Sequence, residues 1–161
     1  IQGNVLNLNN ILPGKEYDAV LCMGPMYHLL EESQREEAIK QSMGLLKRGG
    51  ILIVSFISAY APMIECLRTY PQDIRQQKCS LLKSLEDGRY LPGVEDGFTD
   101  AYFINPEQIE DFMSRFNLEK LKIMAVDGMG LIVEETLMNL KEEDFQDWLD
   151  VFEAIASKQA V

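Results

Sequence analysis

The sequence predicts an α/β fold, because two apolar strand patterns flank a helical pattern near the start of the chain. Residues 17–23 (YDAVLCM) are short, apolar and bounded by Gly14 and Gly24, which is typical of a strand buried on both faces. Residues 50–57 (GILIVSFI) are as continuous and are rich in β-branched side chains. Strand, helix and strand within about 40 residues form a βαβ crossover, so we expect the two strands to be parallel neighbours.

The connecting helix is predicted over residues 33–47 (SQREEAIKQSMGLLK). Its start carries a capping box, in which Ser33 accepts from the backbone amide of Glu36 and the Glu36 carboxylate reaches back. Gly49 and Gly50 follow the helical pattern and are expected to end the helix. The residues that recur at helical spacing, and should face the core, are Ala38, Ile39, Ser42, Met43, Leu45 and Leu46.

The remainder of the chain is predicted to be mostly helical, with one further strand. Residues 58–104 form an excursion that begins with two helices and ends in a glycine-rich surface loop (EDGRYLPGVEDGF). Residues 118–128 (LEKLKIMAVDG) alternate with period two and are expected to form the third strand. Helices are predicted over residues 60–70, 72–86, 105–116, 131–140 and 142–157.

Length and composition limit the classes of function. The chain is long enough for one domain, residues 1–161, and its 47% apolar and 25% charged residues are the balance of a globular protein. A net charge of −11 argues against nucleic acid, whose phosphates are bound by clustered Lys and Arg. No apolar run approaches the roughly 20 residues that span a bilayer, and no secretion signal is found. We therefore expect a cytoplasmic protein with a small-molecule substrate, and neither a nucleic-acid nor a membrane partner.

The cysteines do not indicate a metal site or a disulfide framework. Cys22, Cys66 and Cys79 form no metal-type spacing with His28, the single histidine of the chain, so no metal is predicted. Their odd number also argues against a set of disulfides. Cys22 and Cys66 lie in apolar sequence and are expected to be small core residues.

Three segments, in their order and spacing, resemble the class I S-adenosylmethionine-dependent methyltransferases. They are residues 3–5 (GNV), 17–29 (YDAVLCMGPMYHL) and 45–50 (LLKRGG). In that family the corresponding segments follow the third strand, form the fourth strand with its turn, and end the helix before the fifth strand. The G-P-h-Y-H-L form of the turn, where h is apolar, is common in small bacterial members. The three motifs together are a fairly specific signal, and all of them lie within residues 1–60.

The resemblance implies a Rossmann-like, doubly wound sheet of methyltransferase type, of which this chain is a truncated portion. The family's glycine-rich cofactor loop, the acidic residue that holds the ribose hydroxyls and the last strand are not found in the sequence. Two positions also depart from the family pattern, since Asn4 stands where Asp is usual and Arg48 where Pro is usual. An amide keeps the hydrogen-bonding oxygen of a carboxylate and loses its charge.

Ligands of open parallel sheets bind beyond the carboxyl ends of the strands, where residues 22–28 are predicted to lie. The resemblance implies that S-adenosyl-L-methionine is the cofactor, and that Tyr27 and His28 are the catalytic residues that place the methyl acceptor. An imidazole titrates near neutral pH, so His28 is also a candidate general base. The residues that the resemblance assigns to the cofactor are Gly3, Asn4, Val5, Cys22, Met23 and Gly24.

Other interpretations are open for these residues and for the whole protein. Asn4 can be a turn residue, Met23 a core residue, and His28 a packing residue at the start of a helix. The protein can instead be an inactive methyltransferase-like assembly module, which pairs through an exposed sheet edge as a homodimer. A third interpretation is another doubly wound nucleotide enzyme, such as a dehydrogenase, although the sequence contains no G-x-G-x-x-G motif.

Overall fold

The computed structural model describes residues 1–91, 99–126 and 128–156, which belong to two compact units, Ile1–Asn105 and Pro106–Val161. The first unit combines helices with a small parallel sheet, so the predicted α/β class is confirmed. The described residues of the second unit are helical or irregular. The single domain predicted over residues 1–161 stays a prediction.

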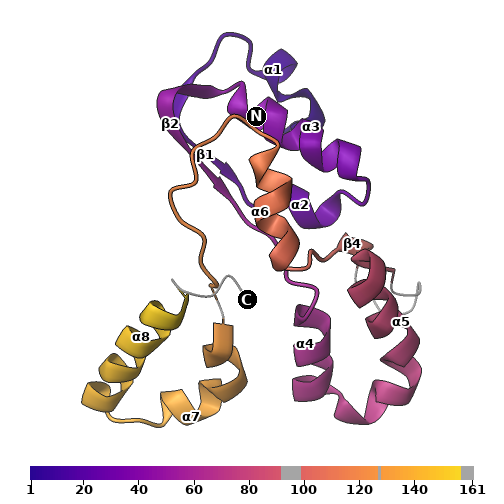
Figure 1. Ribbon diagram of the computed structural model, residues 1–161, viewed down its shortest axis with the longest axis vertical. Coiled ribbons are helices and arrows are strands. Elements are labelled where there is room, and N and C mark those ends of the chain that lie inside the picture. The colour runs from indigo at the N-terminus through magenta and orange to yellow at the C-terminus, as the bar shows by residue number, and fades with distance from the viewer. Residues whose placement is uncertain (92–98, 127, 157–161) are drawn as a thin grey trace. The chain divides into compact units, whose positions relative to one another are not determined.

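The parallel sheet of the first unit is the predicted βαβ crossover. Strand β1 (Tyr17–Cys22) pairs in parallel with β2 (Leu46–Val54), and α3 (Glu32–Met43) connects them and packs on both (Figure 1). In the described residues this sheet has two strands. Both predicted strands and their parallel pairing are confirmed.

Helix α3 ends earlier than predicted. Its last residue is Met43 and its C-cap is Gly44, so the predicted end at Gly49 and Gly50 is wrong. Both later glycines lie in β2, next to a shift of strand register, and Gly49 has a φ of 78°. Glycine adopts this left-handed conformation without a steric penalty, and such a residue can end a helix or form a bulge. The sequence pattern is therefore compatible with both outcomes.

The start of α3 also differs from the prediction. The helix begins at Glu32 after Glu31 as N-cap, and no side chain caps it, so the predicted capping box of Ser33 and Glu36 is wrong. The Glu31 carbonyl accepts from the amides of Gln34 and Arg35 instead. Ser33 is therefore already inside the first turn, where its side chain cannot act as an N-cap. Of the residues expected to face the core, Ala38, Ile39, Ser42 and Leu45 are buried, and Met43 and Leu46 are partly buried.

The sheet is covered on one face, contrary to the predicted burial on both. Leu21 and Ile53 are opposite one another in the ladder, and their side chains are 64% and 47% exposed. Cys22, which follows on the opposite face of the pleat, is buried. Two strands and one packed helix bury one face only, because burial of the second face needs a further layer.

The excursion, residues 58–104, contains the two helices that the sequence predicts. These are α4 (Ala61–Thr69) and α5 (Ile74–Asp87), joined by a turn of 3-10 helix, η2 (Pro71–Asp73). Two short antiparallel strands follow, β3 (Arg89–Tyr90) and β4 (Ala101–Tyr102). Much of the predicted glycine-rich loop, residues 92–98, lies outside the described residues.

The two ends of the excursion are held together by backbone bonds and a small apolar cluster. Ser58 forms a parallel bridge with Ile104, whose amide donates to Ile57 at 2.9 Å. The buried cluster consists of Ala59, Ala101 and Phe103, with Ile57 and Tyr90 packed against it. The chain before β1 forms η1 (Val5–Asn7) and α1 (Leu8–Ile11), which both pack on α3.

The second unit contains α6 (Glu107–Ser114), η3 (Gly128–Val133), α7 (Glu134–Met138) and α8 (Glu142–Ala156). The three helices agree with the predictions, but the strand predicted at 118–128 is wrong, because residues 117–126 are irregular. Leu121 and Val126 are 71% and 91% exposed. A strand is stabilised by backbone bonds to a neighbour, and alternation of side chains does not supply that neighbour. In the described ranges, no helix has the length and apolarity needed to cross a bilayer.

Candidate functional site

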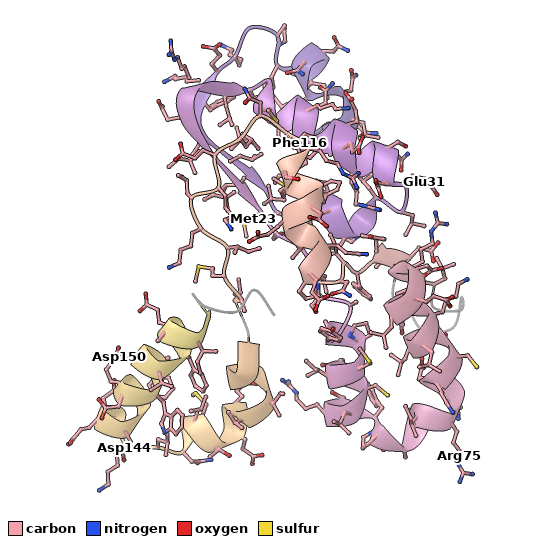
Figure 2. All side chains as sticks on the ribbon, viewed as in Figure 1. Met23, Glu31, Arg75, Phe116, Asp144 and Asp150 are labelled. Carbon is pink, nitrogen blue, oxygen red and sulfur yellow. The ribbon has the colours of Figure 1, made fainter. Side chains whose placement is uncertain are left out.

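The candidate site begins where β1 ends. Cys22 is the last residue of the strand, and Met23 and Gly24 lead into the one-turn helix α2 (Pro25–His28). Pro25 occupies the first helical position, where its missing N–H costs no hydrogen bond and its fixed φ suits the helix. Figure 2 shows Met23 at the end of β1. The structure thus places residues 22–28 at the carboxyl end of a parallel strand, as predicted.

We call residues 23–28, which comprise α2 and the two residues before it, the α2 turn. One of its side chains is buried and two others are exposed. Met26 is 1% exposed and fixes the turn to the interior of the first unit. Met23 is 59% exposed, and His28 is exposed as well. The rings of Tyr27 and His28 are 4.8 Å apart at 55°, so the two predicted catalytic side chains lie together. The backbone of the turn is held by bonds from the Tyr27 amide to Gly24 and from the Leu29 amide to Pro25.

Gly24 leaves open space beside the backbone. A Cβ built on this residue would have one neighbour within 4 Å, the Tyr27 hydroxyl at 3.9 Å. A ligand could therefore approach the main chain closely on this side. Met23 and Gly24 are consequently accessible in the way that the predicted cofactor role requires.

The Cys22 side chain lies in the interior of the first unit and is 3% exposed. Burial raises the pKa of the Cys22 thiol, and the neighbouring Ser42 hydroxyl of α3 opposes this in part. Any role of Cys22 in lining a ligand would therefore fall to its backbone.

The burial of the cysteines predicts very different reactivity. Cys79 is exposed, whereas Cys22 and Cys66 are buried. Because the thiolate is the reactive form and must reach the reagent, Cys79 should react with dithiodipyridine at least about tenfold faster than the other two thiols. Stopped-flow absorbance measurements should show one rapidly reacting thiol, which is absent in a Cys79→Ser variant. Two or three fast thiols in the native protein would contradict this burial.

The segment Gly3, Asn4 and Val5 is held by its own turn. The Asn4 side chain accepts from the Leu6 amide at 2.9 Å and so caps η1. A Cβ on Gly3 would overlap the Ile11 side chain, so this glycine packs closely against α1. In the structure Asn4 is therefore a turn residue, which was the alternative interpretation of this residue. The assignment of these three residues to the cofactor stays a prediction.

Arg35 is a prominent residue next to the site that sequence reasoning missed. It lies on the buried face of α3 and is 4% exposed. Its Nη1 donates to the carbonyls of Leu29 and Leu30 at 2.7 and 2.8 Å, and its guanidinium lies 3.4 Å from the centre of the Tyr102 ring. Burial lowers the pKa of Arg35, and Tyr102 is the main group that opposes this shift. The signal in the sequence was an arginine on the same helical face as Ala38 and Ser42.

An exposed ion pair lies beside Arg35. Arg89 Nη2 is 2.8 Å from Glu31 Oε1, so β3 is linked to the residue before α3. Figure 2 shows Glu31 at that end of the helix. The chain segment that follows His28 is thus connected to both strands of the β3–β4 pair.

No protein-family model matches this chain, and no solved structure matches it either. Among the described residues, no three His, Cys, Asp or Glu side chains are grouped as a metal site would require. What the arrangement offers chemically is an accessible backbone at Gly24, with a phenol and an imidazole side by side. Such groups can bind, orient and deprotonate a small polar molecule.

Proposed function

We propose that this chain forms part of an S-adenosyl-L-methionine-dependent methyltransferase that acts on a small molecule by direct displacement. The observation that carries the proposal is the α2 turn, with the sequence MGPMYH, at the carboxyl end of a parallel strand. Open parallel sheets bind their ligands at this edge. The fold that we propose is the Rossmann-like, doubly wound sheet of the methyltransferases, in which β1, α3 and β2 form one βαβ unit.

The residues at the turn fit the methionine end of this cofactor. Met23 and Gly24 would hold it, because the first is exposed and the second leaves its backbone open. Gly3, Asn4 and Val5 would hold the adenine, and the capping bond leaves the Asn4 amide nitrogen as a donor. When bound, S-adenosylmethionine supplies an electrophilic methyl group.

Tyr27 and His28 are proposed to act on the methyl acceptor. The Tyr27 hydroxyl can donate to or accept from a polar group of the acceptor and so orient it. An acceptor nitrogen or oxygen loses a proton in the reaction, and an imidazole nitrogen of His28 can take it. Positioning supplies much of the rate, since displacement at a sulfonium has a good leaving group.

A glycine substitution separates ligand binding from folding. The Gly24→Ala variant should weaken binding of S-adenosylhomocysteine at least tenfold, about 1.4 kcal/mol, because the methyl group occupies the space beside the backbone. Isothermal titration calorimetry on the full-length natural protein would measure this. The free energy of unfolding should fall by no more than about 1 kcal/mol, since the added Cβ meets no close atom and alanine is a poorer N-cap of α2 than glycine.

Gly130→Ala is the matched control for this variant. Its added Cβ would also have its nearest neighbours at 3.9 Å, in Leu137 and Phe152 of the second unit. This variant should bind S-adenosylhomocysteine like the wild type. If the wild type shows no affinity, or Gly24→Ala binds as tightly as Gly130→Ala, the methyltransferase proposal fails. Titration with NADH tests the dehydrogenase interpretation, in which the protein would bind NADH and not S-adenosylhomocysteine.

The exposed sheet face favours a second candidate, an assembly module without catalytic activity. Leu21, Ile51 and Ile53 are large apolar residues of adjacent strands, and all three are exposed. Apolar patches of this kind mark interaction sites in soluble proteins. Sedimentation velocity over a range of concentrations would test it. An obligate homodimer without affinity for S-adenosylhomocysteine would replace the methyltransferase by this candidate.

A further inference from the structure

Arg35 joins three segments of the first unit that are distant in sequence. It belongs to α3, it donates to the carbonyls of Leu29 and Leu30 after α2, and it stacks on Tyr102 of β4. Helix α2 and strand β4 are also in direct contact. The guanidinium is planar, so one face can cover an aromatic ring while its edge donates hydrogen bonds. This side chain thus connects the turn of the candidate site to the excursion.

A second polar link between the same segments is weaker. The pair of Arg89 and Glu31 has side chains that are 39% and 59% exposed, and exposed ion pairs contribute little. Arg35 is buried, and its bonds to carbonyls are charge-assisted, which makes them shorter and stronger. Of these two links between the excursion and the segment after His28, that of Arg35 is therefore the stronger.

We propose that Arg35 is a positioning residue, which fixes the α2 turn with Tyr27 and His28 against strand β4 of the excursion. The two carbonyls that it binds belong to the residues directly after His28, so a displacement of the guanidinium also displaces the end of α2. The position of the guanidinium in turn depends on the Tyr102 ring, on which it stacks. A movement of the excursion is thereby transmitted to the whole α2 turn, which carries Met23 and Gly24 on the cofactor side and Tyr27 and His28 on the acceptor side. This inference rests on the proposed methyltransferase function and names the residue that controls the geometry of that site.

The ring of Tyr102 is the place to interrupt this connection, because it lies on β4 and leaves the bonds of Arg35 to the carbonyls intact. Tyr102→Leu removes the stacking surface, whereas Tyr102→Phe keeps it. Tyr90→Leu is a matched control on β3. It removes a tyrosine ring from the same pair of strands, where the Tyr90 ring lies 5.5 Å from the Phe103 ring.

Two measurements on each variant separate positioning from general loosening. The first is amide hydrogen exchange at Tyr27 and Leu29, whose N–H groups close the α2 turn. The second is the dissociation constant of S-adenosylhomocysteine by titration calorimetry. For Tyr102→Leu we expect exchange at both amides to become about tenfold faster and the dissociation constant to rise about tenfold. Tyr102→Phe and Tyr90→Leu should stay within about twofold of the wild type in both.

Each other outcome is decisive. Unchanged exchange in Tyr102→Leu, or equal acceleration in Tyr90→Leu, overturns the positioning role of Arg35. Faster exchange in Tyr102→Leu with an unchanged dissociation constant also overturns it, because the turn would then move without an effect on the site. If the wild type does not bind S-adenosylhomocysteine, the proposed function fails, and the exchange data alone still decide whether Arg35 couples the turn to β4.

Discussion

The Arg35→Met variant is expected to lose about 3 kcal/mol of unfolding free energy. Methionine replaces the aliphatic part of the arginine side chain and lacks the guanidinium, so the loss reports mainly on the contacts of that group. The carbonyls of Leu29 and Leu30 lose a shared charged donor, and hydrogen bonds to charged groups contribute about 1.5–3 kcal/mol each. The cation–π contact with Tyr102 is lost as well. Urea unfolding followed by circular dichroism measures this change.

Arg89→Met is the control for that experiment. It makes the same chemical change at a residue whose ion pair with Glu31 is exposed, so the loss should stay below about 1 kcal/mol. Equal losses in the two variants would show that the burial of Arg35 has no energetic consequence. A loss under about 1 kcal/mol for Arg35→Met would mean that water replaces the guanidinium at both carbonyls.

The parts of the fold that could be predicted from the sequence are those where a local pattern has one solution. The apolar runs around β1 and β2 can pair only as parallel neighbours when a helix connects them within a short span. The predicted helix end at Gly49 is wrong because a residue with a left-handed φ is equally suited to a helix end and to a bulge. The alternating residues near Leu121 fit a strand, yet a strand depends on a partner that the pattern does not specify.

The candidate site was predictable as a position and not as a set of contacts. The turn with Tyr27 and His28 follows from the end of a parallel strand and a Gly-Pro start. The burial of Cys22 confirms the expectation of a core residue, but the exposure of the other face of the strand could not be predicted, because a strand that is apolar throughout does not show which face is covered. The position of Arg35 on the buried face of α3 could be predicted from its spacing to Ala38 and Ser42, but its contact with Tyr102 could not, since the two residues are distant in sequence and meet only after the excursion folds back.

Gly88→Ala is expected to be as damaging as the loss of Arg35, at about 3 kcal/mol of unfolding free energy. Gly88 ends α5 with a φ of 74°, a left-handed conformation that costs other residues roughly 1–2 kcal/mol. The added Cβ would also lie 2.8 Å from the Phe103 carbonyl oxygen and 2.6 Å from the Tyr102 ring. The backbone there cannot yield freely, because the Phe103 amide donates to the Gly88 carbonyl at 2.7 Å. Crowding of this kind adds about 1–3 kcal/mol.

Gly14→Ala divides this loss into its two causes. Gly14 also has a left-handed φ, 66°, but an added Cβ would have no atom within 4 Å, so only the conformational cost of about 1 kcal/mol should appear. The excess in Gly88→Ala then measures how firmly Tyr102 and Phe103 are held. Equal losses in urea unfolding would show that β4 moves aside at little cost. A β4 that yields so easily could not hold the Tyr102 ring under Arg35, so this comparison also bears on how the α2 turn is fixed.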